Sequence, residues 1–226
     1  MRACACFLWV EPASRKRTAV IIRNDIVLAT VISLQLLWAP EALAGRDEAT
    51  ERIDLEAFSI LPPDGPAWQT RTRTAQFEAA RLLDGNPIHT FALNAREYPP
   101  SPAPIESLQE LLRAIQAATE KESRNPARFM LTSYEVTEST RLALECVEYR
   151  KRWNDNEVPI AHGTKLIMVA HGLICIHPQE RHRLIEVSYS YRSATGTLTT
   201  EQEHEGVRFL ESVRAWQSAS PLDASD

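Results

Sequence analysis

The feature that most constrains the fold is a run of four β-strand patterns in the second half of the chain. The four segments are 128–138, 141–153, 165–177 and 183–192. Bulky and polar residues alternate in the last segment, whereas 165–177 is apolar on both faces, as an interior strand of a covered sheet would be. Short polar connections join these strands, so they are expected to pair as an antiparallel meander.

Two helix patterns accompany this meander. The first covers 105–122, where apolar residues recur with the helical period after Pro104. The second follows Thr200 and Glu203, whose spacing is that of a capping box. Its apolar stripe consists of Phe209, Leu210, Val213 and Trp216.

The first half of the chain adds further short elements. Strand patterns occupy 58–61, 68–74 and 88–94, while the alanines of 75–83 would also suit a helix. We therefore predict one α+β domain over residues 57–217, with an antiparallel sheet of about six or seven strands and two main helices covering a face of it.

The N-terminus has the layout of a secretory signal. Basic residues at 15–17 precede the uncharged apolar run 26–38, and Ala42 and Ala44 supply the small residues of a cleavage site. The run is shorter than the roughly 20 residues of a comfortable membrane span. We predict a signal peptide over residues 1–44 with cleavage after Ala44; an uncleaved anchor is the alternative.

Export sets the expected environment of the remaining chain. Residues 45–56 are predicted to form a flexible lead-in and residues 218–226 a disordered tail. No second apolar run is long enough to cross a membrane, which indicates a periplasmic or secreted protein. The net charge of −5 provides no basic field for nucleic acid, and no glycine-rich phosphate loop or other cofactor motif occurs.

Cys146 and Cys175 are the two cysteines that would remain after cleavage. An even count in an oxidising compartment predicts a disulfide, the alternative being two buried free thiols. Placing Cys146 opposite Cys175 in a hairpin of 141–153 and 165–177 also places Arg150 opposite His171. For the next pair of strands we expect Ile174 opposite Ile185.

Several short segments carry a resemblance to a known group of proteins. They are Phe58–Pro63 with Trp68, His89–Phe91, Cys146, His171–Gly172, Cys175 with His177–Pro178, and Val187–Ser190. In these segments the chain resembles an uncharacterised family of exported bacterial proteins, whose layout is similar to the Mog1/PsbP fold. The resemblance implies export, an antiparallel sheet covered by helices, and binding or assembly rather than catalysis; it implies no catalytic residues.

The expected strand register gathers polar side chains on one face of the sheet. They are Glu148, Arg150, His171, Glu186, Ser188 and Ser190. Arg150, His171 and Glu186 are the candidate binding residues for a small ligand. The alternative is a half-solvated face whose charges merely pair.

Two other kinds of chemistry are conceivable. Glu148, His171 and Ser188 could form a hydrolytic triad, although the chain has no G-x-S-x-G motif. The loop histidines His162, His177 and His182 could bind a metal, although their spacing matches no zinc signature.

The sequence therefore favours an exported, non-enzymatic envelope protein that binds a protein partner or a small ligand. A small periplasmic hydrolase and a metal-binding protein are the alternatives.

Overall fold

The computed structural model describes residues 51–123, 129–155 and 165–215. The predicted signal peptide 1–44 and tail 218–226 lie outside the described residues, as does His162. The described strands are β1 (Ile53–Asp54), β2 (Phe58–Ile60), β3 (Gln69–Arg73), β4 (Gln76–Leu83), β5 (Asn86–Glu97), β6 (Phe129–Ser139), β7 (Cys146–Asp155), β8 (Leu166–Ile176), β9 (Leu184–Ser193) and β10 (Arg214–Ala215). The described helices are α2 (Leu108–Ser123) and α3 (Thr200–Glu211).

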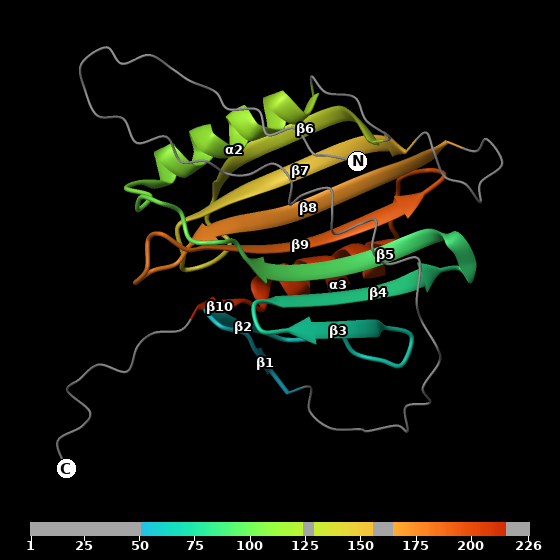
Figure 1. The fold of residues 1–226 in the computed structure, drawn as a ribbon. Helices are drawn as coiled ribbons and strands as arrows, with labels where there is room; N and C mark the ends of the chain where they lie inside the picture. Colours follow the sequence, from blue (N-terminus) through green and yellow to red (C-terminus); the bar gives the residue numbers. More distant parts are fainter. Residues whose placement is uncertain (1–50, 124–128, 156–164, 216–226) are drawn as a thin grey trace, which may run out of the picture.

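The predicted α+β architecture is confirmed. A seven-stranded sheet runs in the order β3-β4-β5-β9-β8-β7-β6, and every neighbouring pair in it is antiparallel (Figure 1). The four strands β6 to β9 form the predicted meander, because short connections let consecutive strands pair. Strands β1, β2 and β10 form a second, small sheet.

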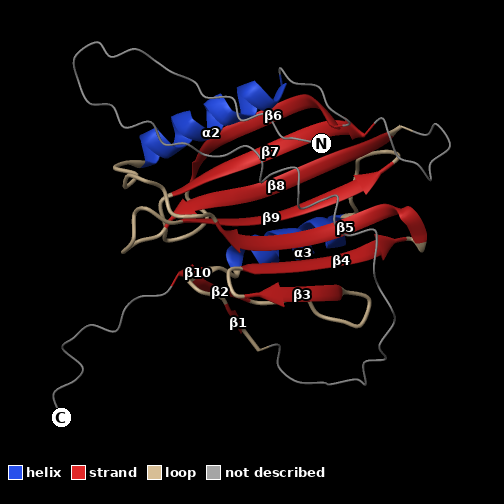
Figure 2. Ribbon diagram, viewed as in Figure 1, coloured by secondary structure: helices blue, strands red, loops and turns tan. Residues whose placement is uncertain are grey.

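The two helices lie on opposite faces of the large sheet, not on the same face as expected (Figure 2). Leu111 and Ile115 of α2 pack in a core with Val147 of β7 and Ile174 of β8. Phe209 and Leu210 of α3 pack in a separate core with side chains of the opposite parity, including Cys146, Leu173, Cys175 and Val187. Successive strand residues point to opposite faces, so the two cores define an α2 face and an α3 face.

Three local expectations are resolved or corrected. The segment 75–83, which the sequence left ambiguous, contains strand β4, because Phe77 and Ala79 alternate with more exposed neighbours and pack into the α3-face core. Residues 53–54 of the predicted flexible lead-in 45–56 form a strand, since Ile53 pairs with Ile60, while 45–50 lie outside the described residues. The capping box of α3 consists of Thr199 and Gln202, one residue earlier than the predicted pair.

The strand register is confirmed between β7 and β8 and corrected between β8 and β9. Cys146 lies opposite Cys175, and Arg150 lies opposite His171, as predicted. In the next pair, however, Ile174 lies opposite Glu186 rather than Ile185. A shift of one residue moves every side chain of β9 to the other face, so the composition of the predicted polar face changes.

Within residues 51–123, 129–155 and 165–215, no helix is long and apolar enough to cross a membrane.

Candidate functional site

The predicted polar face divides into two separate sites. Glu148, Arg150 and His171 lie on the α3 face, together with the disulfide-bonded Cys146 and Cys175. The corrected register places Glu186, Ser188 and Ser190 on the α2 face, opposite Ile174, Gly172 and Ala170. The structure therefore brings Glu148 and His171 together but separates both of them from Glu186 and Ser188.

His171 is buried on the α3 face and both of its ring nitrogens have partners. Nε2 lies 2.6 Å from Oε1 of Glu148 on β7, and Nδ1 lies 2.9 Å from the hydroxyl of Tyr189 on β9. Burial, which is only partly offset by Glu148, lowers the pKa of His171 below 6.5. For a neutral ring, the consistent assignment is that Tyr189 donates to Nδ1 and the Nε2–H donates to Glu148.

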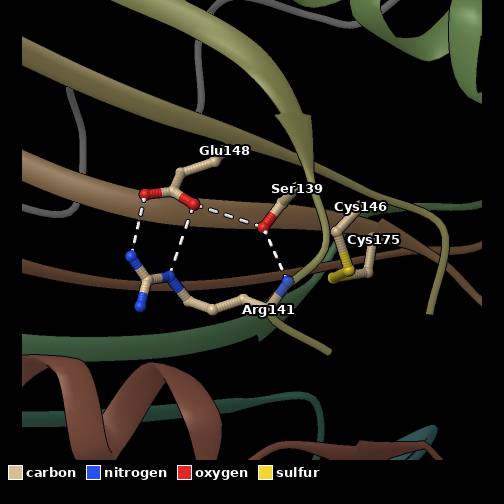
Figure 3. Close-up of a disulfide and its surroundings, with 5 residues drawn as sticks. All are labelled: Ser139, Arg141, Cys146, Glu148 and Cys175. Atoms are coloured by element: carbon tan, nitrogen blue, oxygen red, sulfur yellow. Dashed lines mark hydrogen bonds and ion pairs between the residues drawn. A yellow bond between two sulfur atoms is a disulfide. The ribbon is translucent and has the colours of Figure 1, made fainter. Parts of the chain in front are cut away.

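The carboxylate of Glu148 is held from its other side by the segment between β6 and β7. Arg141 donates from Nε to Oε2 and from Nη2 to Oε1, both at 3.3 Å, and Ser139 donates to Oε2 at 3.2 Å (Figure 3). Burial raises the pKa of Glu148, but the bonds from Arg141 and His171 outweigh burial and leave the pKa lowered. Glu148 is therefore ionised at neutral pH and its oxygens are engaged.

This geometry does not form the conjectured hydrolytic triad. Ser188 lies on the α2 face, on the far side of the sheet from His171. A general base needs a free ring nitrogen within reach of the group that it deprotonates, and both nitrogens of His171 are occupied. The Glu148–His171–Tyr189 chain links β7, β8 and β9 and stabilises the sheet beside the disulfide.

Arg150 is the most exposed member of the predicted set. Its side chain is 56% exposed, and Nη2 lies 3.9 Å from Oε1 of Glu148. Such a long, solvated ion pair contributes little to stability. Arg150 thus remains available to a ligand, but His171 behind it is buried and Glu186 is on the other face.

Glu186 is the centre of a buried network on the α2 face. Oε2 accepts hydrogen bonds from Nε of Arg96 at 2.7 Å and from the hydroxyl of Tyr98 at 2.7 Å. Oε1 accepts one from the hydroxyl of Tyr149 at 2.5 Å. Burial raises the pKa of Glu186, but the charge of Arg96 and the tyrosine hydroxyls lower it below its usual range.

The partners in both networks were missed by the sequence interpretation. Arg96 and Tyr98 follow the predicted strand 88–94, and a continued alternation would have placed Arg96 on the face of Asn94. A glycine within a strand also indicates a close approach by a neighbouring group, and Gly172 is such a residue. The side chain of Tyr149 passes over Gly172, where no side chain blocks it, and so reaches Glu186. Nothing in the sequence identifies Arg141 or Tyr189 as a partner of the site.

The loop histidines form no metal site within the described part of the chain. No described group of three or more histidine, cysteine or acidic side chains is placed to bind a metal ion. Nδ1 of His177 accepts the backbone N–H groups of Gln179 and Glu180, at 3.3 and 3.0 Å, and so closes the turn before β9. His182 is exposed on the next turn.

The part of the α2 face over β3, β4, β5 and β9 carries mostly polar side chains and alanines, with the exposed Leu82 at the end of β4 opposite Thr90. Its polar residues are Arg71, Arg73, Gln76, Glu78, Asn94, Ser188 and Ser190, with Ala80 and Ala92 between them. We call this set the open polar face. Figure 1 shows α3 behind β4 and β5, and none of the described helices lies in front of β3, β4 or β5.

Comparison with known proteins gives no relative from which a role could be transferred. No protein-family model matches the chain, and no curated protein is significantly similar to it.

Proposed function

We propose that this chain is an exported, non-enzymatic protein of the cell envelope that binds a partner protein through the open polar face. The observation that carries the proposal is the distribution of helices on the sheet. α2 packs on β6 and β7 and α3 packs under β9 on the other side, so the polar half of the α2 face is left without a described helix.

The state of the buried ionisable groups supports binding rather than catalysis. The carboxylates of Glu148 and Glu186 and the ring of His171 are saturated by partners within the fold. Groups held in this way stabilise a scaffold, whereas catalysis needs a group that is free to contact a substrate. The side chains on the open polar face, in contrast, have few partners and can contact another protein.

The chemistry of the open polar face also favours a polar protein surface over an apolar ligand. Ser190, Asn94 and Glu78 are half-buried, and Arg71 and Arg73 are exposed. Small-molecule sites are concave and mostly apolar, whereas the rim of a protein interface is polar. The disulfide and the signal-like N-terminus support an envelope location.

Site-specific cross-linking in living cells tests this proposal. A photo-reactive amino acid at Ser190 or Asn94 is expected to capture a discrete partner, because both residues lie within the open polar face. The matched control is Thr137, an exposed strand residue on the α3 face of β6. Equal capture at Ser190 and Thr137, or no capture at Ser190, would contradict the proposal. The intact mass of the mature protein tests export independently, since it shows whether residues 1–44 have been removed.

A further inference from the structure

The seven-stranded sheet is open, so it has two edge strands, β6 and β3. An edge strand presents unpaired backbone N–H and C=O groups and can pair with an extended segment of another chain. The two edges of this sheet differ in how far they are protected from such pairing.

Three features protect the β6 edge. The register with β7 shifts between Leu131 and Ser133, which is a β-bulge-like irregularity. The exposed acidic residues Glu135 and Glu138 lie along the strand. The side-chain amide of Gln116 on α2 donates to the carbonyl of Val136 at 3.5 Å, so α2 also reaches the strand.

The β3 edge has neither a bulge nor a covering side chain. Its five residues pair regularly with β4, from Gln69 opposite Ala80 to Arg73 opposite Gln76. All five residues of β3 are exposed. Within the described part of the chain, the backbone of Gln69–Arg73 makes no hydrogen bond other than those to β4, and the free edge ends there, because the carbonyl of Thr74 accepts a bond from the N–H of Glu56 at 3.0 Å.

Two arginines on β3 define the charge of this edge. Arg71 and Arg73 are two residues apart, so both point to the α2 face and their Cα atoms are about 7 Å apart. Neither arginine forms an ion pair with any residue that the structure describes. The nearest acidic residue across the strand pair, Glu78, accepts a hydrogen bond from Gln76 at 2.8 Å.

We propose that β3 is a strand-addition site for an extended segment of a partner protein that carries acidic side chains two residues apart. This inference rests on the proposed binding function and names the chemistry of the partner. The backbone of the added strand would pair with the free edge of β3, and its two carboxylates would lie opposite Arg71 and Arg73. The partner would then continue onto the open polar face, of which both arginines are part.

The same charges disfavour pairing of β3 with β3 of a second copy of this chain. An antiparallel pairing of two β3 strands with the same face of each sheet aligned places arginine opposite arginine, and directly opposite like charges destabilise a strand pair. Pairing of β3 with an acidic segment is therefore favoured over pairing of β3 with a second β3.

Synthetic peptides test the inference with the purified, disulfide-bonded protein. The probe is a fluorescent nine-residue peptide of valine and threonine with two glutamates at alternate positions, and its binding is followed by fluorescence anisotropy. The control peptide has the same composition with the glutamates adjacent, so that only one can face the arginines. We expect the alternate peptide to bind at least about fivefold more tightly than the control, because only it forms two opposite-charge pairs with the edge.

Protein variants separate the arginines from general charge. Arg71→Gln/Arg73→Gln is expected to remove the preference for the alternate peptide. The matched control, Arg113→Gln/Arg208→Gln, removes the same charge from exposed positions on α2 and α3 and should leave the preference intact. Equal binding of both peptides, or equal loss in both double variants, would overturn the inference.

Backbone methylation of the peptide separates strand addition from charge attraction alone. An added strand uses the N–H groups of alternate residues, so methylating one alternate set should abolish binding and methylating the other set should not. If both methylated peptides bind alike, strand addition is wrong. If no peptide binds but the cross-link from Ser190 persists, the inference fails while the proposed function stands; if that cross-link is absent as well, both fail.

Discussion

Tyr149 on β7 lies across Gly172 on β8, so that a Cβ added at Gly172 would come within 2.6 Å of both Cζ and the hydroxyl oxygen of Tyr149. The glycine is therefore required by a side chain of the neighbouring strand, and its role is to let the Tyr149 hydroxyl reach Glu186 at 2.5 Å. The hydrogen bond from Tyr149 to Glu186 thereby links the half of the α2 face that α2 covers to the half that no described helix covers.

Gly172→Ala should destabilise the protein by about 1–3 kcal/mol, because the new methyl group overpacks against Tyr149 and against Cβ of Ser188 at 2.8 Å. Urea denaturation followed by circular dichroism measures the change in the free energy of unfolding. The penalty should shrink in a Tyr149→Leu background, since the clashing ring atoms are then absent. An unchanged penalty in that background would show that the ring is not the cause.

Glu186→Gln should cost about 3–5 kcal/mol of unfolding free energy, because it removes the negative charge that the buried Arg96 guanidinium and the hydroxyls of Tyr98 and Tyr149 bind. The measurement is the same denaturation experiment at neutral pH. Glu78→Gln is the matched control: Glu78 lies on the same face, is only half-buried and accepts a hydrogen bond from Gln76 at 2.8 Å. A similar cost for both variants would contradict the role of the Glu186 network.

Glu97→Gln should cost less than about 1 kcal/mol, although Glu97 is also a buried carboxylate. Its Oε2 has no hydrogen-bond partner among the described residues, and Arg183, which contacts Oε1, is also paired with Glu56 and Glu180. Burial raises the pKa of Glu97 above 4.5 despite the charge of Arg183.

The pH dependence of the Glu97→Gln variant checks whether burial raises the pKa of Glu97. The folded protein holds the Glu97 proton more tightly than the unfolded chain, so the contribution of Glu97 to stability is greatest in acid and is lost as the pH rises through its raised pKa. Glu97→Gln should remove this part of the pH dependence. A large loss of stability at neutral pH would show instead that the ion pair with Arg183 dominates.

His171 should make the protein less stable in mild acid. Its pKa is lowered in the folded state, mainly by burial, so below about pH 6.5 the unfolded chain binds more protons and the free energy of unfolding falls as the pH drops. Denaturation between about pH 7.5 and pH 5.5 measures this slope while staying above the range in which Glu148 titrates.

Two variants isolate the contribution of His171. His171→Gln should flatten the stability slope in this pH range, because the titrating ring is gone. His182→Gln is the control for replacing a histidine, at an exposed position on a turn. The same slope in all three proteins would show that His171 does not control the pH dependence.

Removing the disulfide should lower the free energy of unfolding by roughly 3–4 kcal/mol, given the 29-residue separation of Cys146 and Cys175. The double variant Cys146→Ala/Cys175→Ala, compared with the oxidised protein by denaturation, measures this loss. Both cysteines are fully buried, so reductant alone should act slowly on the folded protein and quickly once denaturant is added. Rapid reduction without denaturant would contradict the burial of the bond.

The sequence by itself determined the elements that depend on local pattern. Alternation in 183–192 and the apolar run in 165–177 predicted two strands of the meander, and the helical period predicted α2. The pairing of Cys146 with Cys175 determined the β7–β8 register, because a disulfide between neighbouring strands leaves little freedom in their alignment.

The candidate site was decided by the tertiary structure. A shift of one residue between β8 and β9 moved Glu186 and Ser188 away from His171, and the sequence contains no constraint on that pair comparable to the disulfide. The placement of the helices was equally non-local, because an apolar stripe requires a core but does not specify which face of the sheet provides it. Strand pattern therefore determined the elements of this protein, while register and packing decided which polar side chains are buried as structural networks and which remain on the open polar face.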